Sequence, residues 1–249
     1  MIFVMQETKM KDKYITIGNV DVGIFHSQRE VIDEMFHRLA NTGSSVAIAI
    51  NPEKILVSLE SDVIANIIEQ SDIRFPDGIG VVKVMEWRSR QALPRLPGCE
   101  LWQSLMAESG QRNEPVFLVG STEDVIQKTA EQLQKEYKVN LVGVQNGFFR
   151  DDDALIDQII LSKARVVTIA MGSPKQEEII FKCKNAGVQA IFMGVGGTYD
   201  VYTGNVKRAP KIFCNMGLEW FYRLYKQPTR IKRQWRLAYY LWLVLLKRI

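Results

Sequence analysis

Hydrophobic and polar positions alternate in blocks along this chain. Short apolar runs rich in β-branched residues are typical of strands, and stretches with a helical period lie between several of them. One such stretch is "EDVIQKTAEQLQKEY" (123–137). Strands that alternate with helices predict an α/β protein with a parallel sheet covered on both faces. The runs are SVAIAI (45–50), PVFLVG (115–120), VNLVGV (139–144), RVVTIAMG (165–172) and AIFMGVGG (190–197).

Polar and glycine-rich segments follow these apolar runs. Asn51, Asp77, the turn 172–176 and the segment 194–200 each come after a strand-like run. Ligands of open α/β sheets bind outside the carboxyl ends of the strands, so these segments are expected to meet at one edge. Asp77 lies in "RFPDGIGVV" (74–82), and Pro-Asp-Gly is also typical of a surface turn. Both interpretations of Asp77 stay open at this point, and turn chemistry alone favours the second.

The segment "AMGSPKQEE" (170–178) predicts the start of a helix. Ser173 is expected to be the N-cap, Pro174 suits the first helical position, and Gln176 would complete a capping box. The free amides of such a helix start can hold a phosphate, with help from Lys175. The alternative is a well-capped helix without a ligand.

The glycines of "GVGGTY" (194–199) raise the question of a dinucleotide site. Gly194, Gly196 and Gly197 fit part of the fingerprint, but Tyr199 stands where its third glycine belongs. The motif therefore fails. These glycines are better explained by the close approach of another ligand or of a backbone segment.

Charge divides the chain into two parts. Residues 205–249 hold 11 Lys or Arg and one acid, a net charge of +10, whereas residues 1–204 carry −6. We expect an α/β core (1–204) and a basic, aromatic, helical appendage (205–249), which holds three of the five tryptophans. A solvated face and nucleic-acid binding fit this appendage less well, because aromatics are frequent in it and the body is acidic. Diphosphate binding and docking to a membrane surface fit it better.

The location expected for this protein is the cytoplasm. The three cysteines are far apart and without metal-ligand spacing, which indicates free thiols and a reducing compartment. The first 19 residues lack an apolar core of signal-peptide length. The longest apolar run, "LAYYLWLVLL" (237–246), is too short to cross a bilayer, and off the membrane it would favour self-association.

Seven motifs together resemble the WecG/TagA/CpsF family of bacterial glycosyltransferases, in the family's order and over nearly the whole chain after residue 15. The resemblance implies a Rossmann-like parallel sheet flanked by helices. The motifs are NPEK, FPDGIG, LPRLPG, PVFLVG, AMGSPKQE, MGVGGTYDVYTGNVKRAPK and GLEWFYRLYKQPTRIKRQWRL.

The resemblance also implies a reaction. Within the family, this sequence is most similar to the branch that transfers N-acetyl-D-mannosaminuronic acid from UDP to the 4-hydroxyl of GlcNAc on undecaprenyl diphosphate. That transfer inverts the configuration at the anomeric carbon. The reaction would take place at the inner face of the cytoplasmic membrane, without metal or cofactor. The alternative is the same fold with UDP-N-acetylmannosamine or another UDP-hexose. Ala49 argues against N-acetylmannosamine, because the teichoic-acid branch has a Thr two residues before the Asn.

Particular residues take roles from the resemblance. Asp77 matches the general base and Arg95 an arginine near the reacting groups. Lys54 is our hypothesis for the cation that meets the uronate carboxylate, and a solvent-facing lysine is the alternative. The other residues expected to bind substrate are Asn51, Gly172, Ser173, Lys175, Gln176, Gly196, Gly197 and Asp200 in the core, and Arg223, Arg230 and Arg233 in the appendage.

Overall fold

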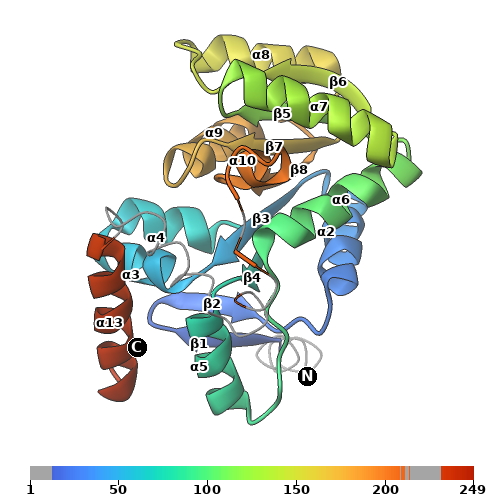
Figure 1. The fold of residues 1–249 in the computed structure, drawn as a ribbon. Helices are drawn as coiled ribbons and strands as arrows, with labels where there is room; N and C mark the ends of the chain where they lie inside the picture. Colours follow the sequence, from blue (N-terminus) through green and yellow to red (C-terminus); the bar gives the residue numbers. More distant parts are fainter. Residues whose placement is uncertain (1–12, 208, 211–212, 214–230) are drawn as a thin grey trace.

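A six-stranded sheet, parallel throughout, forms the centre of the molecule (Figure 1). The computed structural model describes residues 13–207, 209, 210, 213 and 231–249, and only the backbone of 231–234. The strand order is β4-β3-β8-β7-β5-β6. The strands are β3 (Ser45–Ile50), β4 (Ile73–Pro76), β5 (Pro115–Gly120), β6 (Asn140–Gln145), β7 (Val166–Ala170) and β8 (Ile191–Gly194).

Two layers of helices cover this sheet. Successive side chains of a strand point to opposite faces, so Val46, Ile48 and Ile50 of β3 enter one core and Ala47 the other. The first core includes residues of α3 (Pro52–Glu60), α4 (Asp62–Glu69), α5 (Ile79–Ser89), α8 (Asp152–Ser162) and α9 (Lys175–Asn185). The second includes residues of α2 (Gln28–Thr42), α6 (Gly98–Gln111), α7 (Glu123–Tyr137) and α10 (Thr198–Tyr202).

The structure confirms the α/β class and the five predicted strands, with ends that shift by three residues or fewer. The predicted helix at 123–137 is α7. The antiparallel pair of β1 (Tyr14–Ile17) and β2 (Val20–Gly23) was not predicted. Each of its strands has four residues, which is too short for a clear period.

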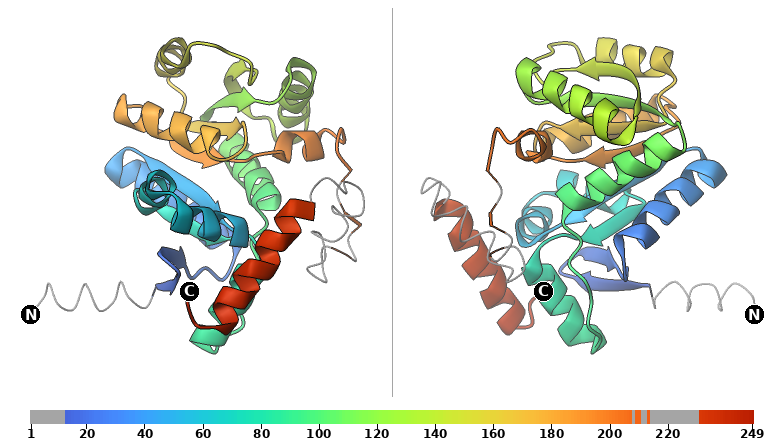
Figure 2. Two further views of the ribbon diagram at one scale, coloured as in Figure 1. Left: turned by 90° about the vertical axis from the view of Figure 1, so that its left-hand side faces the viewer. Right: turned by 45° about the vertical axis from the view of Figure 1, so that its right-hand side comes forward.

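The C-terminal helix α13 (Ile231–Leu245) packs on the body, beside α3 (Figures 1 and 2). Tyr240, Leu243 and Ile249 are buried in the first core. Arg236 forms an ion pair with Glu60 at 2.8 Å. The end of the appendage is thus joined to the core through a packed face. Among the site predictions in the appendage, Arg223, Arg230 and the side chain of Arg233 lie outside the described residues.

Candidate active site

The strand order has a switch point at the carboxyl edge of the sheet, between β3 and β8, and we call this place the crevice. β3 and β8 are neighbours, yet the chain leaves β3 into α3 on one face and leaves β8 into α10 on the other. Loops that diverge in this way leave room between them, and such a point is the usual ligand site of an open α/β sheet. Asn51 and the turn 195–197 border this crevice, and the Asp77 turn lies one strand further along.

Asp77 is fixed in place at the end of β4. Its backbone N–H donates to the carbonyl of Ile50 at 3.0 Å, so the turn is tied to the end of β3. The amide of Gly98, the first residue of α6, donates to Asp77 Oδ1 at 3.0 Å. Arg95 donates to the Asp77 carbonyl at 2.6 Å and lies 3.9 Å from Oδ1. An amide at a helix start and a guanidinium both stabilise the ionised carboxylate.

Asn51 lies directly against the Asp77 turn and has a structural role. Its Oδ1 accepts from the backbone N–H of Lys54 at 2.9 Å and caps α3. A Cβ on Gly78 would lie 3.1 Å from the Cβ of Asn51. Asn51 therefore sets both the start of α3 and the position of the turn that carries Asp77.

A buried ion pair joins the helices that follow β3 and β7. Lys54 Nζ donates to Glu177 Oε1 at 2.6 Å, and their side chains are only 10% and 3% exposed. The alternative of a solvent-facing Lys54 is therefore wrong. Glu177 was missed by the sequence analysis, although Ile179, Ile180 and Cys183 indicate the buried face of α9. Nothing in "QEE" alone distinguishes Glu177 from the exposed Glu178.

Gln176 bridges α9 to the turn after β8. Its Oε1 accepts from the backbone N–H of Gly196 at 2.9 Å, and its Nε2 donates to Glu177 at 2.9 Å. The predicted capping box is therefore wrong: the N-cap of α9 is Pro174, without a side-chain cap, and the helix begins at Lys175. The reason is that burial directs the Gln176 amide across the sheet edge instead of back along its own helix.

Three of the predicted glycines face open space. A Cβ on Gly172, Gly196 or Gly197 would meet no atom of the described residues within 4 Å. Gly172 and Gly196 have positive φ angles of 76° and 53°, which explain these two glycines. Gly197 has an ordinary φ of −82°. Neither backbone conformation nor packing accounts for the glycine at position 197.

The remaining predicted residues lie at the same edge with different surroundings. Asp200 accepts from Ser121 Oγ at 3.2 Å and from Asn205 Nδ2 at 2.7 Å, so it joins the ends of β5 and β8. Ser173 and Lys175 are exposed, and the Lys175 ammonium lies 5.4 Å from the centre of the Phe149 ring. Within the described part of the chain, no three His, Cys, Asp or Glu side chains gather closely enough to hold a metal.

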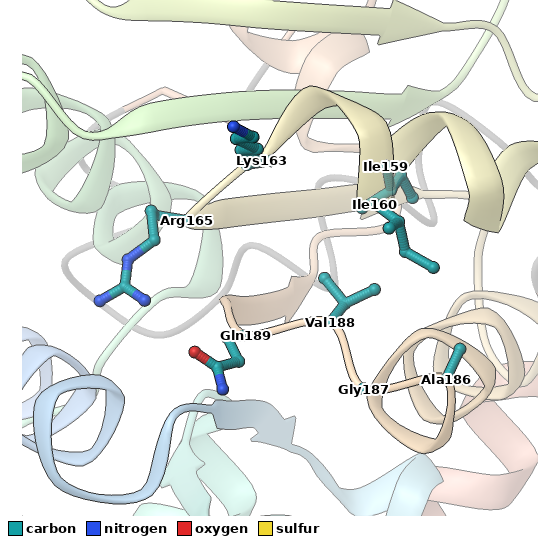
Figure 3. A pocket seen from close by; sticks show the side chains of 9 residues that line it. Ile159, Ile160, Lys163, Arg165, Ala186, Gly187, Val188 and Gln189 are labelled. Carbon is teal, nitrogen blue, oxygen red and sulfur yellow. The ribbon is translucent and has the colours of Figure 1, made fainter.

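A hollow of about 260 Å³ lies at the opposite, amino-terminal edge of the sheet (Figure 3). Arg165 and Gln189 come just before β7 and β8, and Ile159 and Val188 form apolar parts of its lining. This edge is where strands begin, so none of the predicted site residues lies here.

The fold and the crevice define an α/β protein of the class that binds its ligand between the carboxyl ends of parallel strands. The model of the glycosyl transferase WecG/TagA/CpsF family matches residues 15–249. The chain therefore belongs to this family and is a glycosyltransferase, with a nucleotide-sugar donor and a lipid-linked acceptor. None of the helices in the described residues has the length and apolar character needed to span a bilayer.

Proposed function

We propose that this enzyme transfers N-acetyl-D-mannosaminuronic acid from UDP to the 4-hydroxyl of GlcNAc on undecaprenyl diphosphate. Family membership supports the reaction class. Ala49, at the position where the teichoic-acid branch has a Thr hydroxyl, favours the uronate over N-acetylmannosamine. The alternative donor is UDP-N-acetylmannosamine or another UDP-hexose on the same fold.

The observation that carries the donor site is Gly197. Gly197 has an ordinary φ and no described neighbour within 4 Å of a Cβ, and in this proposal the donor occupies that space. The strands that precede Gly197 and Asp77, β8 and β4, are two positions apart in the sheet. Two strand spacings are roughly 10 Å, so a donor lying along the edge spans from the glycine turn to the acid.

Asp77 is the general base in this proposal. Its carboxylate takes the proton of the acceptor hydroxyl while the acceptor oxygen attacks the anomeric carbon. The bond from that carbon to the diphosphate oxygen breaks, and UDP leaves with the electron pair on the opposite face. The contacts of Asp77 with Gly98 and Arg95 fix its carboxylate in place at the end of β4. In the proposal, the hydrogen bond from Arg95 to the Asp77 carbonyl keeps the Asp77 carboxylate facing the acceptor hydroxyl.

Charge for the two anionic parts of the donor comes from different residues. The leaving diphosphate needs positive groups near the crevice, and Arg223, Arg230 and Arg233 take that role in the proposal. The carboxylate of the uronate is assigned to Lys54. An ammonium has three N–H donors, and in the described part of the chain one of those of Lys54 is bonded to Glu177.

The exposed face of α13 is the membrane contact in this proposal. Trp235, Tyr239, Trp242 and Leu245 are each about half exposed or more, and Lys247 and Arg248 lie beside them. Aromatic and cationic side chains of this kind suit the interface of an anionic bilayer. Exchange of Trp235 and Trp242 for Ser should therefore release the protein from anionic vesicles in a flotation assay. Flotation equal to the wild type would remove this role.

The deciding experiment measures UDP release with a GlcNAc-diphospholipid acceptor and each of the two donors. We expect release with UDP-N-acetylmannosaminuronic acid and little with UDP-N-acetylmannosamine, and Lys54→Ala should narrow that preference. Release with the uncharged donor alone would contradict the proposed donor. Release with neither would contradict the proposed substrate pair.

A further inference from the structure

Glu177 lies at the centre of a buried set of hydrogen bonds that joins the starts of α3 and α9 to the turn after β8. One of its oxygens, Oε1, accepts both from Lys54 Nζ at 2.6 Å and from Gln176 Nε2 at 2.9 Å. The other end of the Gln176 amide accepts from the Gly196 N–H at 2.9 Å. These hydrogen bonds thus run from the first turn of α3, through the start of α9, to the glycine turn after β8.

The carboxylate of Glu177 determines which way the Gln176 amide points. An ionised carboxylate only accepts hydrogen bonds, so the NH₂ group of Gln176 must face it. The carbonyl oxygen of Gln176 then faces the Gly196 N–H, which needs an acceptor. Without an acceptor at position 177 the amide is free to flip, and its NH₂ group would oppose the N–H of Gly196.

The neighbouring glycine shows how closely Gln176 is fitted. A Cβ on Gly194 would lie 2.6 Å from Gln176 Nε2, so only a glycine lets this side chain cross the end of β8. Gly196 and Gly197, two and three residues further on, have no described atom within 4 Å of a Cβ. The Gln176 amide therefore supports one side of the turn 195–197, and the described residues leave the other side open.

Stability does not explain this arrangement. Glu177 Oε2 is buried and has no hydrogen-bond partner in the described part of the chain. A carboxylate that is buried with one oxygen unpaired costs free energy of folding, and an apolar residue of similar volume would avoid that cost.

We infer that Glu177 is a positioning residue for the donor. It orients Gln176 so that the turn 195–197 stays open to the nucleotide sugar, and it holds the Lys54 ammonium at the crevice. The inference rests on the proposed function in that the donor occupies this turn. Glu177 itself does not touch the reacting atoms.

The experiment compares Glu177→Gln with Glu177→Leu. The Gln variant keeps an acceptor oxygen, whereas the Leu variant keeps only the volume. Titration calorimetry with UDP should show at least a tenfold higher Kd for the Leu variant and a Kd within threefold of the wild type for the Gln variant. The KM for the UDP-sugar should follow the same order, while kcat at saturating donor changes less than threefold.

A matched control breaks a different ion pair of α9. Asp152 of α8 lies 2.7 Å from Lys182 Nζ of α9, in a pair that is more exposed than Lys54–Glu177, and Asp152→Asn should leave the Kd for UDP unchanged. Gln176→Met removes the amide and keeps the Lys54–Glu177 pair, so it should weaken UDP binding as much as Glu177→Leu does. It also tests the inference if Glu177→Leu fails to fold.

The outcomes separate the inference from the proposed function. Equal Kd values for UDP in the wild type, Glu177→Leu and Gln176→Met would overturn the positioning role, whatever their thermal stabilities. Absence of UDP binding by the wild type would instead overturn the proposed donor site, and with it the inference.

Discussion

The two edges of the sheet differ in what lines them. The carboxyl edge holds a fixed acid, a buried chain of hydrogen bonds and three glycines that face open space. The amino edge holds the hollow of about 260 Å³, and its one described ion pair from a lining side chain, Arg165 to Glu114, is 3.9 Å long. A hollow of about 320 Å³ also lies at the carboxyl edge, where Thr122 at the start of α7 and Thr203 and Asn205 after α10 line it. A hollow alone therefore does not distinguish the two edges; the organisation of polar groups does.

The largest effect is expected from Asp77→Asn. The Asn Oδ1 can still accept from Gly98, so the fold and UDP binding should be retained while the base is lost. General bases contribute about 10²- to 10⁴-fold to rate, so kcat should fall by a factor in this range. Such a fall corresponds to a rise of about 3–5 kcal/mol in activation free energy. Turnover in a UDP-release assay measures this.

Gln189→Ala is the control from the amino edge. Gln189 is exposed and lines the hollow, far from the carboxyl ends of the strands. Turnover by the Gln189→Ala variant should equal that of the wild type. A loss of turnover in Gln189→Ala, or near wild-type turnover in Asp77→Asn, would contradict the assignment of the active site to the carboxyl edge.

Much of the fold was predictable, because five strands and the helix 123–137 carry strong local patterns. The meeting of Asn51, Asp77 and the turns 172–176 and 194–200 at one edge was predictable too, since parallel strands end on the same side. The pairing of Lys54 with Glu177 was not. It joins positions 123 residues apart, and no local period encodes a contact between two separate helices.

The capping-box error has the same origin. The segment after Gly172 has the right residue types for a local cap, and the sequence offers no sign that Gln176 has a partner 20 residues away. Tertiary contacts override local preferences most readily at buried positions, and Gln176 is one of them.

A bulky side chain at position 197 tests the open space directly. Gly197→Leu is compatible with the backbone, since φ is −82° and no atom in the described part of the chain lies within 4 Å of the new Cβ, so the protein should fold. We expect the KM for the UDP-sugar to rise at least tenfold, which corresponds to about 1.4 kcal/mol. Steady-state kinetics with varied donor measure it.

The matching change at the amino edge is Gly187→Asn. Gly187 lines the hollow, also faces open space and has a φ of 85°, a left-handed conformation that Asn tolerates. The KM of the Gly187→Asn variant for the UDP-sugar should not change. A donor KM that stays at the wild-type value in Gly197→Leu would mean that the open space at the carboxyl edge is not the donor site.

The smallest effect concerns Cys183, a buried thiol near the end of α9, which is followed by the hollow's lining residues Ala186 and Val188. Burial raises the pKa of its thiol from 9.0 to about 12. The unfolded chain loses this proton above pH 9 while the folded chain keeps it, so stability falls as pH rises from about 9 towards 12. At pH 10 the loss is about 1.4 kcal/mol. Urea unfolding at pH 8 and pH 10 should show a smaller decrease in Cys183→Ala than in the wild type, with turnover at pH 8 unchanged. An equal decrease in both proteins would exclude this thiol as its source, and lost turnover would give the amino edge a part in the reaction.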